Sequence, residues 1–89
     1  MTDSELLKFA AKAAGMTGNL AWWNPLDDDG DALRLAVKLN LHVLRFDNMT
    51  TVRKIGTDFG CDERDDGDPS AATRLAIVRV ADEIGRAMP

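Results

Sequence analysis

Cys61 and His42 are the one pair of residues in this chain that could act as a nucleophile and its general base, because the chain contains a single cysteine and a single histidine. A reactive thiolate needs cationic neighbours, and nothing cationic other than Arg64 is near Cys61 in the sequence. His42 falls in a segment predicted to be a strand, where packing is the expected role. We therefore predict no catalytic residues and no enzyme activity.

Two clusters of acidic residues could in principle bind a cation. Four aspartates lie within positions 27–31, and six acids lie between Asp58 and Asp68. A calcium loop with its glycine at Gly30 or Gly67 would have a proline or an arginine at a ligand position and would lack the closing glutamate. One cysteine and one histidine are too few for a zinc site. The sequence therefore predicts no metal and no cofactor, and we interpret the aspartates as helix caps and solvated loops.

The charge balance argues against nucleic acid as a partner. The net charge is −4, and the main basic cluster consists of Arg45, Arg53 and Lys54, whereas binding to phosphate backbones depends on many cations. No apolar run approaches the length of a membrane span, and the first residues lack the features of a secretion signal. We expect a protein of the cytoplasm with no membrane partner.

Two adjacent tryptophans precede a proline and an acidic helix start. Both tryptophans can belong to the core. Because neighbouring side chains point in different directions in most backbone conformations, the alternative is that one enters the core while the other anchors a partner protein. The acidic clusters would then attract a basic surface of that partner. The predicted partner-binding residues are Trp22, Trp23, Asp27, Asp28, Asp62, Asp65 and Asp66.

Three helices are predicted from apolar periodicity and from capping residues. The first spans 2–14, where Thr2 and Glu5 have the spacing of a capping box. The second runs from about Asp29 to Leu39, with Arg34 and Lys38 as its solvent edge. The last begins at Asp68-Pro69, because aspartate caps a helix and proline suits its first position, and it runs to about residue 86 with Asp82 on its solvent side.

A β-hairpin is predicted between the second and third helices. Residues 41–46 and 51–55 are rich in strand formers, and the turn lies at Asp47-Asn48. We expect His42, Leu44 and Phe46 to face the helices, with Ile55 joining them. Residues 56–67 are predicted to be a polar connection, which would carry Cys61 as a loop thiol and return Phe59 to the core.

The predicted fold is a single small α+β domain over 1–89, with three helices packed on a short antiparallel hairpin in the order α-α-β-β-α. A two-stranded sheet is marginal by itself. An extra short strand is therefore expected, either from residues 18–23 or from a second copy of the chain, so a homodimer is one prediction.

Two segments resemble a family of small phage and prophage proteins, the phage α/β/α-sandwich family. They are the segment of residues 23–36, WNPLDDDGDALRLA, and the segment of residues 68–79, DPSAATRLAIVR. These are cap, turn and core positions, so the resemblance carries no chemistry over to individual residues. It implies a phage or prophage accessory protein in the cytoplasm of a bacterial host. The segment 15–22 departs from the family pattern because it is short.

Taken together, these patterns predict a non-catalytic module that binds a host or phage protein and modulates or inhibits a host factor. Two alternatives remain open from the sequence. One is a homodimer that binds a small ligand or an ion, and the other is a structural component of a phage assembly.

Overall fold

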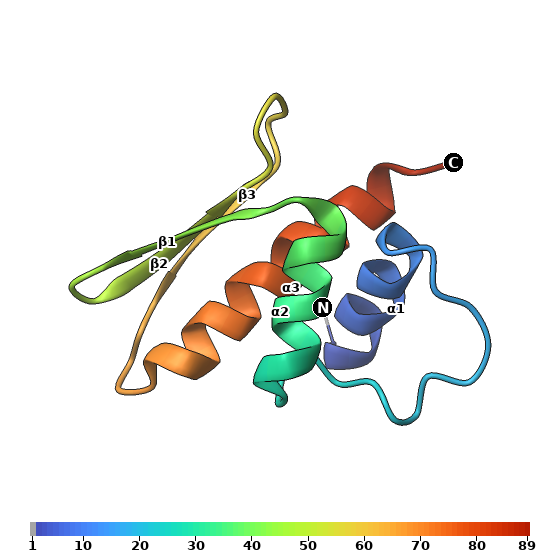
Figure 1. The fold of residues 1–89 in the computed structure, drawn as a ribbon, viewed down its shortest axis with the longest axis horizontal. Coiled ribbons are helices and arrows are strands. Elements are labelled where there is room, and N and C mark those ends of the chain that lie inside the picture. The colour runs from blue at the N-terminus through green and yellow to red at the C-terminus, as the bar shows by residue number, and fades with distance from the viewer. Residues whose placement is uncertain (1) are drawn as a thin grey trace.

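The computed structural model describes residues 2–89 as three helices beside a three-stranded antiparallel sheet (Figure 1). The elements in chain order are α1 (Asp3–Ala13), α2 (Asp29–Leu39), β1 (His42–Phe46), β2 (Met49–Arg53), β3 (Gly60–Arg64) and α3 (Pro69–Ala87). The helices lie on one face of the sheet, and among the described residues no element covers the other face (Figure 1). The predicted α+β class is confirmed.

The helices begin where the capping residues predict. The side chain of Thr2 accepts a hydrogen bond from the backbone N–H of Glu5, that of Asp28 from Asp31, and that of Asp68 from Ala71. Each bond satisfies one of the backbone donors that a helix start leaves without an intrahelical partner. At the other end of α2, Asn40 adopts the left-handed conformation with φ of 55°. None of the helices described is long and apolar enough to cross a membrane.

Helix α3 is the centre of the core, since α1, α2, β2 and β3 all pack against it. Its buried positions are occupied mainly by small or β-branched residues: Ala72, Ala76, Ile77, Val78, Val80, Ala81 and Gly85. These short side chains let α1 approach closely. A Cβ atom on Gly85 would lie 1.9 Å from the carbonyl oxygen of Phe9, so the crossing of α1 and α3 requires glycine there.

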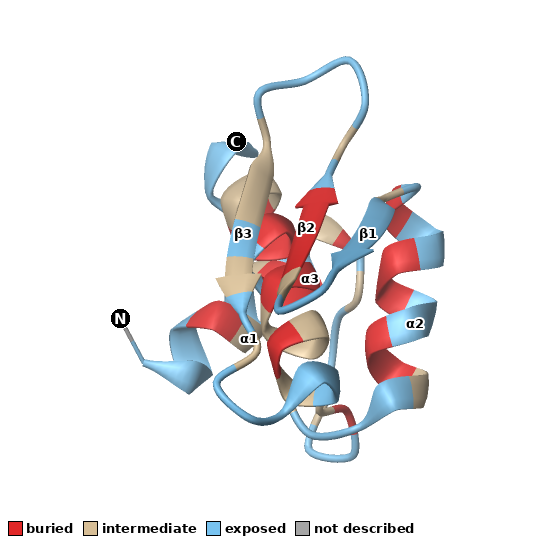
Figure 2. Ribbon diagram, turned by 90° about the vertical axis from the view of Figure 1, so that its left-hand side faces the viewer, coloured by how far each residue is buried: buried red, intermediate tan, exposed pale blue. Residues whose placement is uncertain are grey.

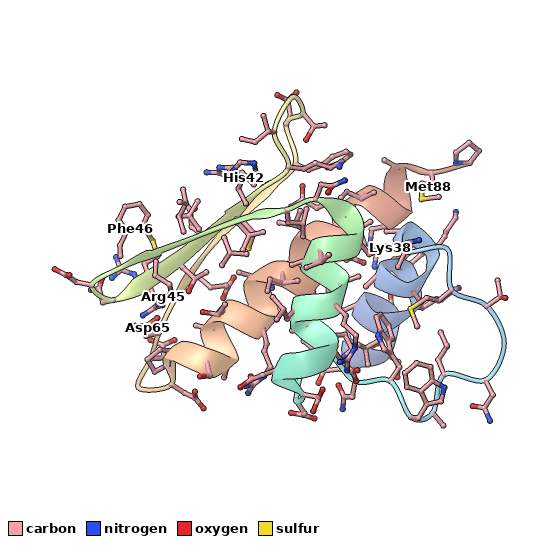
Figure 3. All side chains as sticks on the ribbon, in the orientation of Figure 1. Lys38, His42, Arg45, Phe46, Asp65 and Met88 are labelled. Atoms are coloured by element: carbon pink, nitrogen blue, oxygen red, sulfur yellow. The ribbon has the colours of Figure 1, made fainter. Side chains whose placement is uncertain are left out.

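The sheet has the order β1-β2-β3, with Val52 of β2 opposite Val43 on one side and Cys61 on the other. The predicted face of β1 is wrong. His42 and Phe46 lie on the side away from the helices (Figure 3), and Leu44 shares their face by alternation along the strand; both apolar residues are at least half exposed. Val43 and Arg45 face the helices instead, because alternation along the strand places them on the same face as buried Val52.

The third strand comes from the segment predicted to be a polar connection. Residues 60–64 pair with β2, whereas residues 18–23 form a loop with no strand. Cys61 is consequently a half-buried strand residue and not a loop thiol. Phe59 does pack against the core, as predicted, but Ile55 does not join the sheet and is 66% exposed.

Two predictions about helix faces are wrong. Asp82 was expected on the solvent side of α3 but is buried, where its carboxylate accepts a hydrogen bond of 2.8 Å from Arg86. On α2, the apolar arc is wider than the core can cover, so Leu33 and Val37 are 64% and 67% exposed. Figure 2 shows these exposed turns of α2 on the same side of the molecule as the exposed strand β1.

We predict that replacing Gly85 with alanine lowers the free energy of unfolding by about 1–3 kcal/mol, the usual cost of overpacking a core. The added methyl group must push α1 away from α3, because its nearest contact is backbone. Urea denaturation measures the change. The exposed Ser70→Ala on the same helix is the control and should shift stability by no more than about 0.5 kcal/mol. Equal effects of the two variants would contradict the close crossing.

Candidate functional site

The loop between α1 and α2 separates the two tryptophans. Trp23 is buried in the core cluster with 7% exposure, and Trp22 is 69% exposed. A turn closed by the hydrogen bond from Trp23 N–H to the carbonyl of Leu20 places them this way. The expectation that one tryptophan enters the core while its neighbour reaches the surface is therefore met, and of the two, Trp22 is left as the accessible partner-binding candidate.

Asn24 and Asp31 fix the backbone that follows the tryptophans. The Asn24 N–H donates to the Asp31 carboxylate at 2.9 Å, and the Asn24 side chain accepts from Leu26 N–H and donates to Asp27. The hydrogen bonds from Asn24 and from Arg34 hold the pKa of Asp31 below its ordinary value, and its burial opposes them. Asp31 is therefore an ionised group that ties the tryptophan loop to the first turn of α2.

Arg74 joins this loop to α3. Its Nε donates to the carbonyl of Leu26 at 2.8 Å, and its guanidinium pairs with Asp29 at 2.5 Å. The sequence-based reading did not identify Arg74 or Asp31 as important, because both contacts need partners that only the fold brings near. Two of the aspartates at positions 27–31 are therefore engaged within the protein, Asp29 by Arg74 and Asp31 by Asn24, and Asp28 serves as the α2 cap.

A groove of about 320 Å³ lies beside Trp22. We call it the Trp22 groove, and its walls come from the end of α1, the loop and α2; the lining residues are Ala14, Met16, Trp22, Trp23, Arg34, Leu35 and Lys38. Its rim is charged on the α2 side only. Arg34 contacts Asp31 and Asp28, so one edge is already partly neutralised, while Lys38 projects from α2 on the side facing away from β1 (Figure 3).

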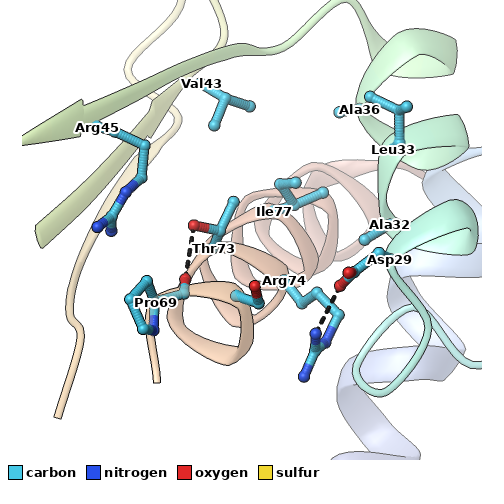
Figure 4. A pocket seen from close by; sticks show the side chains of 11 residues that line it. Asp29, Ala32, Leu33, Ala36, Val43, Arg45, Pro69, Thr73, Arg74 and Ile77 are labelled. Carbon is cyan, nitrogen blue, oxygen red and sulfur yellow. Dashed lines mark hydrogen bonds and ion pairs between the residues drawn. The ribbon is translucent and has the colours of Figure 1, made fainter. Parts of the chain in front are cut away.

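A second groove, of about 330 Å³, lies between β1, α2 and α3 (Figure 4). We call it the β1 groove. Val43 of β1 and Leu33 of α2 project into it from opposite sides, and Ile77 of α3 forms its floor (Figure 4). The charged side chains at its ends are paired, Arg74 with Asp29 and Arg45 with Asp65. The groove is therefore apolar at its centre.

Strand β1 is held above this groove by a chain of polar contacts. Arg45 donates two hydrogen bonds to Asp65, at 2.5 and 2.9 Å, and a third to the Thr50 hydroxyl. Thr73 donates its own proton to the carbonyl of Pro69, so the 2.8 Å contact between the two threonines uses the proton of Thr50. The hydrogen bonds from Arg45 keep the pKa of Asp65 below its ordinary value.

The predicted partner-binding residues do not form one site. Trp22, Asp27 and Asp28 belong to the same loop and the start of α2, whereas Asp62, Asp65 and Asp66 lie on β3 and the turn after it. Asp62 contacts Arg53 and accepts a hydrogen bond from Thr51, and Asp65 is bound by Arg45. Two of the three acids at that end are therefore engaged within the protein.

Cys61 and His42 do not form a catalytic pair. His42 lies on the outer face of the sheet, and Cys61 lies two strands away on the face toward the helices. Burial and the contact with Glu63 raise the pKa of the Cys61 thiol to about 11. Among residues 2–89, no group of three or more His, Cys, Asp or Glu side chains is placed to hold a metal ion.

Comparison with protein-family models, with curated proteins and with solved structures finds no match for this chain. The resemblance to the phage α/β/α-sandwich family therefore stays a prediction.

We predict that Asp31→Asn lowers the free energy of unfolding by about 1 kcal/mol at neutral pH, the difference between a charged and a neutral acceptor. The folded-state pKa of Asp31 is lowered, so its charge stabilises the fold above the ordinary value of 3.8 and this contribution is lost as pH falls below it. The difference in the free energy of unfolding between Asp31→Asn and the parent should become smaller in acid. Denaturant titrations at neutral pH and in acid measure this difference, with the exposed Asp58→Asn as the control. A difference in the free energy of unfolding that does not depend on pH would contradict this role of Asp31.

We also predict that the native Cys61 thiol reacts with iodoacetamide at mildly alkaline pH about 100-fold more slowly than the unfolded chain. Raising the pKa from 9.0 to about 11 removes most of the thiolate, and burial adds a steric barrier. His42→Ala should leave the rate unchanged. Fast alkylation that depends on His42 would show that the two residues cooperate.

Proposed function

We propose that this protein is a non-catalytic protein-binding module and that Trp22 is its anchor. The observation that carries the proposal is the 69% exposure of the Trp22 side chain beside an apolar groove of about 320 Å³. Tryptophan is enriched among residues that dominate binding energy at protein interfaces. An exposed indole next to a concave apolar surface offers a partner both a projecting contact and a pocket.

The backbone around Trp22 supports this proposal because it is fixed from both sides. Trp23 is buried immediately after it, and Asn24 is bonded to the carboxylate of Asp31. A loop ordered before binding loses less conformational entropy when the partner arrives. Trp22 is therefore presented by a rigid support and not by a flexible tail.

The charges near the groove support a partner with a mixed polar rim. Asp27 and Asp28 are exposed at the start of α2, and Lys38 lines the groove from the last turn of the same helix. The net charge of −4 favours the approach of a basic surface. Asp62 and Asp65 are weaker candidates for attracting that surface, since arginines of the same chain already pair with them.

The partner that we propose is a host or phage protein in the cytoplasm of a bacterial cell. This rests on the resemblance of the segments around Trp23 and Asp68 to small phage proteins. Modulation or inhibition of a host factor would follow if the partner surface covered by Trp22 were needed for that factor's own contacts.

We predict that Trp22→Ala weakens binding to the partner by about 30-fold or more, the loss expected for an interface hot spot. The fold should be retained, because the side chain projects into solvent. The measurement is affinity capture from bacterial lysate with tagged parent and variant, followed by titration of each captured protein against both.

Ile55→Ala is the matched control, since Ile55 is also a large apolar side chain with 66% exposure but lies away from the Trp22 groove. Its partners should be retained at parental affinity. If the Trp22→Ala variant folds and still binds every specific partner, Trp22 is not the anchor. If divalent ions or nucleotides raise the melting temperature and no protein is captured, the ligand-binding alternative is favoured instead.

A further inference from the structure

The free edge of strand β1 has few of the features that normally keep an edge strand from pairing, since its one inward-pointing charge, Arg45, is already paired with Asp65. Protected edges carry lysine, proline, a bulge or inward-pointing charge. Residues 42–46 contain no lysine or proline, and their register with β2 is unbroken from His42 to Phe46. The other edge, β3, carries three consecutive charged residues at 62–64. The two edges of the sheet are therefore unequal, and β1 is the one open to pairing.

We propose that β1 pairs with β1 of a second copy of this chain, which joins two sheets into one of six strands. This surface is separate from the Trp22 groove, so the inference does not depend on the proposed function. The occupant is inferred from the strand itself, whose side chains complement their own symmetry-related copies.

The register of such a pair follows from the hairpin. Phe46 and Met49 close a two-residue turn and form a hydrogen-bonded pair. Alternation along an antiparallel ladder then directs the backbone N–H and C=O groups of Val43 and Arg45 away from β2. A two-fold axis at Leu44 would place Val43 of one copy opposite Arg45 of the other, and each of the two symmetric pairs would exchange two hydrogen bonds.

The outer face of that register would be apolar and aromatic. Leu44 would meet Leu44 of the second copy on the axis, and His42 would meet Phe46 on either side of it. Leu44 and Phe46 are 50% and 55% exposed in the single chain. Cross-strand pairs of this kind each stabilise a sheet modestly, and none brings two like charges together.

The inner face of the register is also compatible with a second copy. Arg45 is the one permanent charge on β1, and Asp65 already neutralises it. Antiparallel pairing keeps the helices of both copies on the same side of the sheet. Leu33 of α2, which lines the β1 groove together with Val43, would then face its counterpart beneath the junction.

The apolar area that is exposed on β1 and α2 is comparable with the apolar area that one partner contributes to an interface of standard size. Five large apolar side chains are exposed on the two elements: Leu44 and Phe46 on the outer face of β1, Val43 on its inner face, and Leu33 and Val37 on α2. Together they expose roughly 500 Å², which is about the apolar share of the ~800 Å² that each partner contributes to an interface of standard size.

The test is sedimentation velocity of the full chain across the micromolar range. The parent should sediment as a dimer, and Leu44→Glu should weaken self-association by at least about 100-fold, because it places two carboxylates opposite each other on the axis. Leu44 is half exposed, so folding should persist, and circular dichroism checks this. Ile55→Glu adds the same charge at an exposed apolar residue away from the edge and should remain dimeric.

A charge-swap mixture identifies the axis. Leu44→Lys alone should also be monomeric, whereas an equimolar mixture of Leu44→Glu and Leu44→Lys should form a heterodimer, because residue 44 of each copy meets residue 44 of the other. A monomeric parent at every concentration, a folded Leu44→Glu that stays dimeric, or a mixture that does not associate would each overturn the proposal. A monomeric parent that still captures a partner through Trp22 would leave the proposed function standing.

Discussion

Burial of α3 is the constraint on which the rest of this structure depends. In a chain of 89 residues, one helix is packed by neighbours on several sides, and its small residues allow α1 to cross it in contact with the backbone at Gly85. The helices α1 and α2 and the strands β2 and β3 each pack against α3. Helix α2 contacts it along one side, whereas β1 pairs with β2 and makes few contacts with α3. The elements farthest from α3 therefore keep a second apolar surface that the single chain does not cover, and this is why Leu33, Val37 and Leu44 are exposed in a well-packed protein.

Features that depend on neighbouring residues could be predicted from the sequence. The three helix caps and the turn at Asp47-Asn48 all involve contacts within a few positions, and the structure confirms them. Strand β3 could not be predicted, because Gly60–Arg64 has no apolar alternation and becomes a strand only through pairing with β2. The face of β1 was predicted wrongly for a related reason. Its larger apolar residues lie on the outer face, and the preference of apolar residues for the core is a poor guide in a strand that overhangs the core.

The candidate site was predictable only in part. The sequence left open whether Trp22 and Trp23 are both buried or only one of them is, and which one would be exposed, since that depends on the turn closed at Leu20. The acidic clusters were harder to interpret. Three of their members pair with arginines that are distant in the sequence: Asp29 with Arg74, Glu63 with Arg79 and Asp65 with Arg45. A run of acids that looks like a solvated surface in the sequence is thus partly an internal network that joins the loops to α3 and the sheet.

This internal pairing of charge decides which forces remain for binding. Exposed or half-exposed ion pairs contribute little to stability individually, yet each one removes a charge that a partner would otherwise meet. The surfaces left open on either side of α2 are the Trp22 groove and the β1 groove, and both have apolar centres. If β1 joins two copies, the dimer carries two Trp22 grooves on a rigid frame. Two linked sites raise the apparent affinity for a partner that is itself repeated or dimeric without any new contact. Weak single-site binding by a small surface around Trp22 would then be sufficient, provided that the partner spans both grooves.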